Sequence, residues 1–347
     1  MTDLLSRRQM MTLLAGIGLA GFSQVAMAAP AASSATPATA GNLRLAVVLP
    51  SKQSAFYKAC QDGAQEAVTA IGGVDVVFVA PDKPVARDQI ALVNELIKQK
   101  VDAIAIAPVE GNALGPSCRR AMARGIKVVS FSEALPVGVR LVHLSGSSPN
   151  GKARAFMSML ADDLKQGGDV AILAGDRQDD ADGTVLSQTM REWLKPAYGN
   201  LKLAATSYGN VDDKASYAAT ENLLKDHPDL KGILVFNPPA LVGAARYIQD
   251  NGLAGKVFVT GFGRPSQLKL AMAAQVVEYF AFTNPIDLGY GAVEIAVALA
   301  KKQASADAGS TIAAGRLGQI AIGKGNVATL APLVIDEKNF DKFADVD

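Results

Sequence analysis

Residues Asn42 to Ala70 read NLRLAVVLPSKQSAFYKACQDGAQEAVTA, and this run predicts the first unit of an open α/β sheet. The apolar residues Leu43 to Leu49 end at Pro50 and are too few to span a membrane, so they are typical of a buried strand. After the polar residues Ser51 to Ser54, small residues recur at helical spacing and predict an amphipathic helix from Ala55. In such sheets ligands bind beyond the carboxyl ends of the strands. The loop after this strand is therefore part of a candidate site.

The strand–helix unit repeats in two successive sets of about five. Each predicted strand is apolar along its length, as burial on both faces of a parallel sheet requires. We therefore predict an α/β fold with two doubly wound parallel-sheet lobes. No third glycine completes a GxGxxG pattern after Gly261 and Gly263, which argues against a dinucleotide site. The expected strands cover residues 43–49, 74–79, 101–107, 127–131, 139–144, 169–173, 201–206, 232–236, 256–260 and 276–282.

The first residues predict a targeting segment rather than part of the fold. Arg7 and Arg8 precede a short apolar run, and Ala26 to Ala28 matches a small-residue cleavage site. We expect residues 1–28 to be a signal peptide, and the paired arginines are typical of the twin-arginine route. An uncleaved anchor is the alternative, although the apolar run is shorter than the roughly 20 residues that a bilayer needs. Residues 29–41, rich in Ala, Ser, Thr and Pro, predict a disordered leader.

Charge, histidines and cysteines exclude several classes of function. A net charge of +1 gives no field that favours nucleic acid or anionic membranes. His143 and His227 are the only histidines, and no Ser-His-Asp, Cys-His or HExxH pattern includes them, so we predict no enzyme, metal or cofactor. We expect His143 to lie in the core.

In a sheet ordered 2-1-3-4-5, Cys60 and Cys118 fall on helices that cover opposite faces. We therefore expect two buried thiols, with a disulfide as the alternative.

Motifs along nearly the whole mature chain match those of one family in order. Two aromatic residues precede KACQDGAQ, residues 101–108 read VDAIAIAP, residues 125–129 read GIKVV, residues 232–237 read GILVFN and residues 259–262 read VTGF. Together they resemble the periplasmic sugar-binding proteins of the ribose-binding type. Residues 284–290 (NPIDLGY) and 333–340 (LVIDEKNF) are similar to the rhamnose- and autoinducer-2-binding branch of that family.

The resemblance implies a type I periplasmic binding protein, whose two lobes are joined by a three-segment hinge and close on a ligand. It implies a monomeric receptor in the periplasm that binds a small sugar or sugar-like diol and delivers it to an ABC permease in the inner membrane. The implied first lobe comprises residues 42–145 and 284–316, and the implied second lobe comprises residues 146–283 and 317–347.

The resemblance also assigns candidate ligand residues in the first lobe. Phe56 and Tyr57 match the aromatic pair that stacks on the sugar, although either ring could instead anchor the helix in the core. Lys52 corresponds to a lysine of the autoinducer-2 branch, or is a solvated surface residue. Ser132 and Glu133 stand where the family usually has Asp followed by Arg or Ser. The Asp is missing and Glu133 lies one position along, which argues against a standard hexose or pentose.

Four further candidates follow strands of the second set or the crossover. Asp180 matches a ligand-binding Asp in a loop rich in carboxylates, for which Ca²⁺ binding is an alternative. Asn237 matches a family Asn that bonds the sugar, and Phe262 follows a strand, although the family Asp after it is Gly263 here. Asn284 is either a polar ligand residue or the cap of the next helix.

Three other functions remain open. The same fold could serve a membrane sensor, including one for autoinducer-2. An enzyme could use the carboxylate-rich loop, although no nucleophile or metal set accompanies it. A sugar-responsive repressor would need an N-terminal helix-turn-helix, and a signal peptide and leader occupy that place instead.

Overall fold

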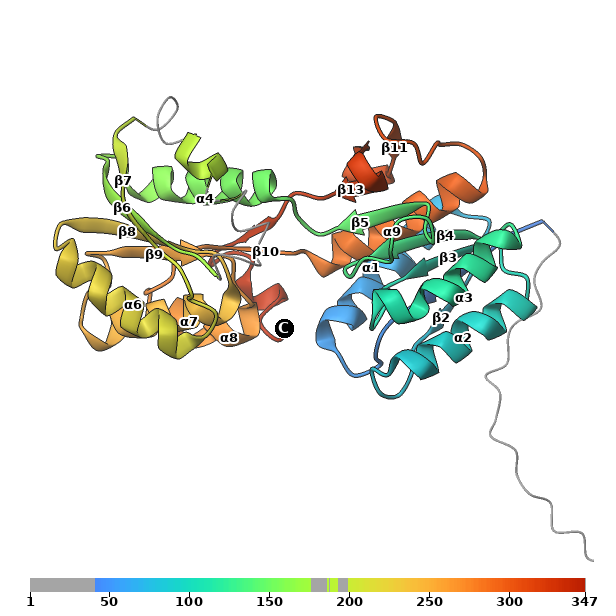
Figure 1. The fold of residues 1–347 in the computed structure, drawn as a ribbon, viewed down its shortest axis with the longest axis horizontal. Coiled ribbons are helices and arrows are strands. Elements are labelled where there is room, and N and C mark those ends of the chain that lie inside the picture. The colour runs from blue at the N-terminus through green and yellow to red at the C-terminus, as the bar shows by residue number, and fades with distance from the viewer. Residues whose placement is uncertain (1–40, 176–185, 187, 193–198, 347) are drawn as a thin grey trace, which may run out of the picture. The chain divides into compact units, whose positions relative to one another are not determined.

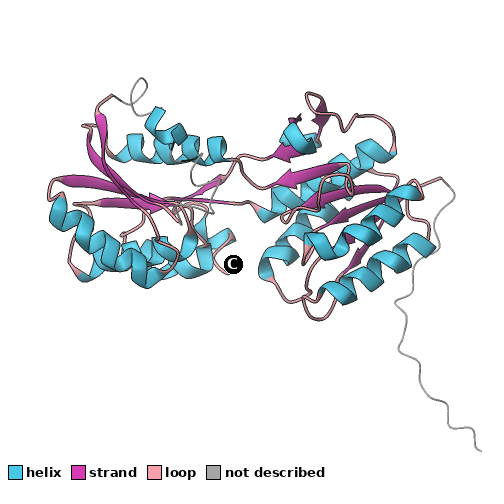
Figure 2. Ribbon diagram, viewed as in Figure 1, coloured by secondary structure: helices cyan, strands magenta, loops and turns pink. Residues whose placement is uncertain are grey.

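The computed structural model describes residues 41–175, 186, 188–192 and 199–346, and Figure 1 shows the path of the chain through them. Helices and strands alternate along this path, and the strands gather into two mainly parallel sheets (Figure 2). The α/β fold predicted from the sequence is confirmed. Asp180 and the carboxylate-rich loop around it lie outside the described residues.

The first sheet has the strand order β11-β12-β13-β5-β4-β3-β1-β2. Strands β1 to β5 are parallel and have the predicted order 2-1-3-4-5. Alternate residues of β1 explain its burial, because Leu45 and Val47 join one core cluster while Ala46 and Val48 join another. Helices α1 and α9 cover the first of these faces, and α2 and α3 cover the second. The elements are β1 (Leu43–Val48), α1 (Ala55–Ile71), β2 (Val74–Val79), α2 (Ala86–Lys98), β3 (Ala103–Ile106), α3 (Gly111–Ala123), β4 (Lys127–Phe131), β5 (Val142–Ser145), α9 (Pro285–Ala300), β11 (Thr311–Ala313), β12 (Gln319–Gly323) and β13 (Val327–Thr329).

The second sheet has the parallel order β7-β6-β8-β9. Strand β10 pairs antiparallel with β14, and a bridge between Phe262 and Ala281 joins β10 to the end of β9. Helix α4 packs on one face, and α6, α7 and α8 pack on the other (Figure 1). The elements are α4 (Pro149–Asp163), β6 (Gly168–Leu173), β7 (Leu201–Ser207), α6 (Asp213–Asp226), β8 (Leu230–Val235), α7 (Pro238–Asp250), β9 (Phe258–Gly261), α8 (Pro265–Ala273), β10 (Phe280–Phe282) and β14 (Leu333–Ile335).

The chain passes between the two sets of elements three times. The first two passages lie between β5 and α4 and between β10 and α9. The third lies between Thr329 and Leu333 rather than near Leu317, because β12 pairs with β13 and β13 pairs with β5. Residues 317–329 therefore belong with the first sheet, which corrects the predicted boundary. Ile320 and Ile322 of β12 are buried in the core beneath α9, and this packing holds the β12–β13 pair against the first sheet.

The two cysteines are free and buried on opposite faces of the first sheet, as predicted. Cys60 packs in the cluster beneath α1 and α9, and Cys118 packs in the cluster beneath α2 and α3. Within the described part of the chain, no helix is both long and apolar enough to span a membrane.

Candidate functional site

Tyr57 and Ser132 meet at the carboxyl end of the first sheet. The Oγ of Ser54 accepts a hydrogen bond from the Tyr57 N–H at 3.4 Å, and this N-cap fixes the first turn of α1. The Tyr57 hydroxyl then lies 3.3 Å from the Oγ of Ser132, which directly follows β4. Burial raises the pKa of Tyr57 above its usual value, so the phenol is protonated at neutral pH. The pair offers two hydroxyl groups beside an aromatic ring, a combination suited to a sugar.

The backbone of Ser132 is in the left-handed region. Its φ is 62°, which is uncommon for a residue other than glycine, and its N–H donates a hydrogen bond to the Leu144 carbonyl at 3.3 Å. Residues held in this region often belong to functional sites. The following residue, Glu133, is exposed. The structure thus brings Ser132 to Tyr57 and leaves Glu133 at the surface.

The Phe56 ring is half-buried and packs against other rings. Its centroid lies 5.3 Å from that of Tyr57 at an interplanar angle of 85°, and 6.5 Å from that of Phe282 at 88°. Both are edge-to-face contacts of the kind that aromatic pairs prefer. Of the two predicted aromatic residues, Phe56 therefore anchors the start of α1, while the Tyr57 hydroxyl points toward a strand end.

Lys52 lies apart from this pair. Its ammonium forms an ion pair with Asp82 at 2.7 Å, and the two side chains are 62% and 88% exposed, so the pair contributes little stability. Asp82 follows the edge strand β2, which lies on the opposite side of β1 from β4. A pocket of about 260 Å³ beside Lys52 is lined by Leu49, Ser51, Lys52, Lys58, Gln61, Phe78, Val79 and Ala80.

Asn237 is the N-cap of α7, which packs on the second sheet. Its Oδ1 accepts a hydrogen bond from the Ala240 N–H at 3.0 Å, and its Nδ2 donates one to the Asn210 carbonyl at 2.6 Å. An asparagine amide has two donor hydrogens and two acceptor lone pairs. Within the part of the chain that the structure describes, one donor and one acceptor position of this amide have no partner.

Phe262 follows β9 and is half-buried. Its N–H donates a hydrogen bond to the Val235 carbonyl at 2.9 Å, which extends the ladder between β8 and β9 by one residue. The Nζ of Lys152, in α4, lies 4.6 Å from the centroid of the Phe262 ring, within the range of a cation–π interaction. The Lys152 ammonium is thus one partner of the Phe262 ring, and Lys152 was not among the residues predicted from the sequence.

Asn284 caps α9, as one of the two sequence interpretations predicted. Its Oδ1 accepts hydrogen bonds from the N–H groups of Ile286 and Asp287 at 3.1 and 3.4 Å. Its Nδ2 donates to Asp287 Oδ2 at 2.7 Å. The other oxygen of Asp287 is 2.5 Å from Nη1 of Arg316, which also pairs with Glu66 at 2.8 Å. The cap therefore belongs to an ion-pair network on the first lobe.

Two buried amides near the strand ends escaped the sequence analysis. Gln89 of α2 and Asn210, just after β7, are 0% and 2% exposed. Both hydrogen-bond the backbone where strands end. A polar residue within the apolar stripe of a predicted helix is the signal that could have identified Gln89.

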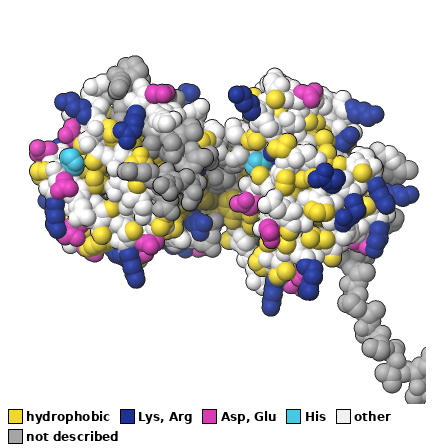
Figure 3. Space-filling view, viewed as in Figure 1, with side chains coloured by type: hydrophobic (Ala, Val, Ile, Leu, Met, Phe, Trp, Pro, Cys, Tyr) yellow, Lys and Arg dark blue, Asp and Glu magenta, His cyan; other side chains and the backbone are white. Residues whose placement is uncertain are grey.

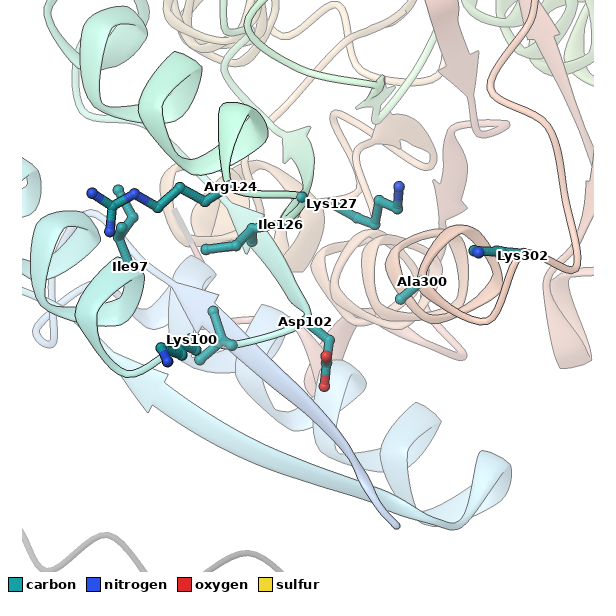
Figure 4. Close-up of a pocket in the computed structure, with 10 residues that line it drawn as sticks. Ile97, Lys100, Asp102, Arg124, Ile126, Lys127, Ala300 and Lys302 are labelled. Atoms are coloured by element: carbon teal, nitrogen blue, oxygen red, sulfur yellow. The ribbon is translucent and has the colours of Figure 1, made fainter.

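Another pocket of the first lobe, larger than the one beside Lys52, lies at the opposite end of the strands (Figure 4). It has a volume of about 420 Å³ and lies where β3 and β4 begin. Helices α2, α3 and α9 all end beside it, so its cationic side chains lie where the negative ends of helix dipoles favour positive charge. The helix dipoles therefore explain the cationic lining of this pocket. The pocket lies away from the carboxyl ends of the strands, where ligands of such sheets bind. Its lining comprises Ile97, Lys100, Val101, Asp102, Arg124, Gly125, Ile126, Lys127, Ala300 and Lys302.

Charges on the molecular surface are mixed. On the face drawn in Figure 3, basic and acidic side chains are interspersed over the described elements. This distribution agrees with the net charge of +1. Groups of at least three His, Cys, Asp or Glu residues that could hold a metal ion are absent from the described residues.

Comparisons with known proteins agree on the class of protein. The chain is 29% identical over 230 residues to the D-ribose/D-allose-binding protein of Pseudomonas aeruginosa, which covers 65% of this chain and 72% of that protein. A sugar ABC transporter structure from Actinomyces odontolyticus matches with a TM-score of 0.74 and 25% identity, over 87% of this chain and 97% of that one. An ABC transporter solute-binding protein from Clostridium phytofermentas with bound L-rhamnose matches with a TM-score of 0.58 and 26% identity, over 88% and 99%.

These proteins bind substrates rather than transform them, and the resemblance to ribose-type receptors is confirmed. The family model described as a periplasmic binding protein domain matches residues 45–304, which is most of the chain. The chain therefore belongs to the periplasmic binding protein domain family.

Proposed function

We propose that this protein is the solute receptor of a bacterial ABC importer and binds a small sugar or sugar-like diol. The observation that carries the proposal is the pairing of the Tyr57 phenol with Ser132 at the carboxyl end of the first sheet. Asn237 and Phe262 occupy equivalent positions in the second sheet. An aromatic ring with hydroxyl or amide groups at each set of strand ends can contact the apolar and polar sides of one sugar.

The relatives support a sugar rather than another solute. One is named for D-ribose and D-allose, and another was solved with L-rhamnose. Two acidic positions common among sugar receptors hold other residues here, namely Ser132 in the first lobe and Gly263 in the second. A ligand with fewer hydroxyl groups than a hexose, such as a deoxysugar, fits these replacements because fewer strong acceptors are present.

The proposal places the receptor in the periplasm as a monomer that presents its closed form to an inner-membrane permease. The predicted signal peptide over residues 1–28 and the family both support that location. Closure would occur at the three chain passages near residues 145–149, 282–285 and 329–333, since hinges are a few residues at the ends of elements.

A thermal-shift screen of residues 29–347 tests the proposal. The panel contains D-ribose, D-allose, L-rhamnose, D-arabinose, polyols and autoinducer-2-type diols. A ligand at 100 times its Kd adds about 2.7 kcal/mol of stability, enough for a clear rise in melting temperature. We expect one or a few related sugars to give that rise. The same response to every compound, or no response to any sugar or diol of the panel, would contradict the proposal.

A further inference from the structure

A buried glutamine joins the ends of β1 and β3. Gln89 lies in the first turn of α2 and is 0% exposed. Its Nε2 donates hydrogen bonds to the carbonyls of Leu49 at 3.2 Å and Ala107 at 2.8 Å. Its Oε1 accepts one from the Val109 N–H at 2.8 Å. One side chain therefore binds the loop after β1 and the loop after β3.

Both strands need such a partner at this point for the same reason. The last ladder bonds run from Leu49 N–H to Val79 and from Ala107 N–H to Val48. The N–H groups that would next bond the Leu49 and Ala107 carbonyls belong to positions 81 and 50, and both are proline, which has no N–H to donate. Buried carbonyls beyond that point would lose a partner, at a cost that the Gln89 amide removes.

The second sheet contains a similar arrangement built from a different residue. Asn210 follows β7, and its Nδ2 donates hydrogen bonds to the Ala174 carbonyl after β6 at 3.2 Å and to the Ser207 carbonyl at 2.9 Å. Its own carbonyl accepts a hydrogen bond from Asn237, which follows β8. In each sheet, a buried residue that follows the second strand thus connects the ends of the first and third strands. Gln89 does so with its side chain alone, and Asn210 does so with its side chain and its main-chain carbonyl.

We infer that Gln89 is a positioning residue of the ligand site, and that it fixes the loop from Leu49 into α1 against the loop after β3. The inference rests on the proposed function, because the positioned elements carry the proposed ligand residue Tyr57. Gln89 itself has both ends of its amide occupied by backbone. It acts on the ligand only through the loops that it holds.

If Gln89 only stabilised the fold, removing its amide would act like the truncation of another buried side chain of α2. A positioning role predicts an additional effect on the two loops. The test variant is Gln89→Met, which keeps the volume of the side chain but leaves three backbone groups without a partner. The matched control is Val93→Ala, one turn later on α2. Val93 is also 0% exposed and packs in the core cluster beneath α2 and α3, but it makes no hydrogen bond to either loop among the described residues.

Hydrogen–deuterium exchange without ligand is the first measurement. After correction for each variant's global stability, we expect the Val109 amide and residues 51–57 to exchange at least tenfold faster in Gln89→Met than in Val93→Ala. Equal exchange in the two variants would overturn the inference, whatever the protein binds. If Gln89→Met does not fold, Gln89→Asn retains the amide, is shorter by one methylene and is measured in the same way.

Affinity is the second measurement, made with the panel sugar that gives the largest thermal shift. We expect Gln89→Met to weaken binding by about tenfold, the low end of the loss seen when partners that orient metal-binding side chains are removed, and Val93→Ala by no more than about twofold. Faster loop exchange with unchanged affinity would reduce Gln89 to a structural role. If the wild-type protein binds none of the sugars, the proposed function fails, and the exchange result still decides whether Gln89 fixes the loops.

Discussion

Two asparagines followed by proline show how single residues serve both fold and site. Asn237 and Asn284 both use the side-chain oxygen to cap a helix that begins with proline. Proline is favoured at that position because its missing N–H would have no partner there, so the Asn-Pro pattern predicts a cap from sequence alone. Whether either amide also binds a ligand depends on the donor and acceptor positions that the cap leaves open.

The cap of α9 can be separated from a ligand role by two substitutions. Asn284→Ala removes the acceptor for two backbone N–H groups and should lower the free energy of unfolding by about 1 kcal/mol. Asn284→Ser retains a capping oxygen and should retain most of that stability. Urea denaturation measures both. Equal losses would contradict the cap, whereas reduced sugar affinity in the stable Asn284→Ser variant would assign the amide to the ligand.

His143 predicts how stability changes in mild acid. Burial, followed by the charge of Arg140, lowers the pKa of His143 from 6.5 to about 4, and its ring lies 3.1 Å from Ser130 Oγ. The unfolded chain therefore binds a proton between pH 6.5 and 4 that the folded protein does not. Stability should fall as the pH drops through this window, by up to roughly 3 kcal/mol from this residue.

The measurement is the free energy of unfolding of the wild type and of His143→Gln at several pH values. The difference between the two curves isolates the histidine, since the carboxylates titrate in both proteins. We expect that difference to change between pH 6.5 and 4 and to be constant above about pH 7. A difference that stays constant throughout would show that folding does not shift the pKa of His143, which would contradict this prediction.

At the scale of elements, close contact between α1 and α9 depends on glycine. A methyl group at Gly289 would overlap the carbonyl of Cys60, and one at Gly63 would overlap the carbonyl of Ile286. The missing side chains let the two helices approach more closely than larger residues allow. The helix that bears Tyr57 is held in this way against a helix more than 200 residues later in the sequence.

A matched pair of substitutions tests this helix contact. Gly289→Ala should lower the free energy of unfolding by about 1–3 kcal/mol through overpacking. Gly115→Ala, in the middle of α3, meets only Val139 at 3.8 Å and should be neutral or stabilising by up to about 1 kcal/mol, because alanine is the better helix former. Thermal or urea denaturation provides the comparison. Equal effects of the two substitutions would contradict the close packing.

The sequence predicted the βα units because each strand is short, apolar and ended by Pro or a polar loop. The doubly wound fold that these units indicate supplied the order of the first five strands. It could not predict the partner of residues 319–323. Their alternating burial fits any sheet with one covered face, and only pairing through β13 to β5 assigns them to the first sheet.

The convergence of Tyr57 with Ser132 was predictable because parallel strand ends meet at one edge. The role of Gln89 was not, since it depends on backbone groups 18 and 40 residues away.

At the scale of the whole molecule, the proposed site needs both sheets. Tyr57 follows the first strand of one sheet, and Phe262 follows the last parallel strand of the other. A ligand that contacts both would favour one arrangement of the two lobes over others, which is how a receptor reports occupancy to a permease. Substitution at either ring should therefore weaken the same binding event.

Isothermal titration calorimetry with the sugar that gives the largest thermal shift tests this claim most directly, on the wild type, Tyr57→Ala and Phe262→Ala. We expect one sugar per chain in the wild type and binding at least about tenfold weaker in each variant, a loss of roughly 1.4 kcal/mol or more. No binding by the wild type, or a variant on either sheet that binds as tightly as the wild type, would contradict a sugar receptor that uses both sheets.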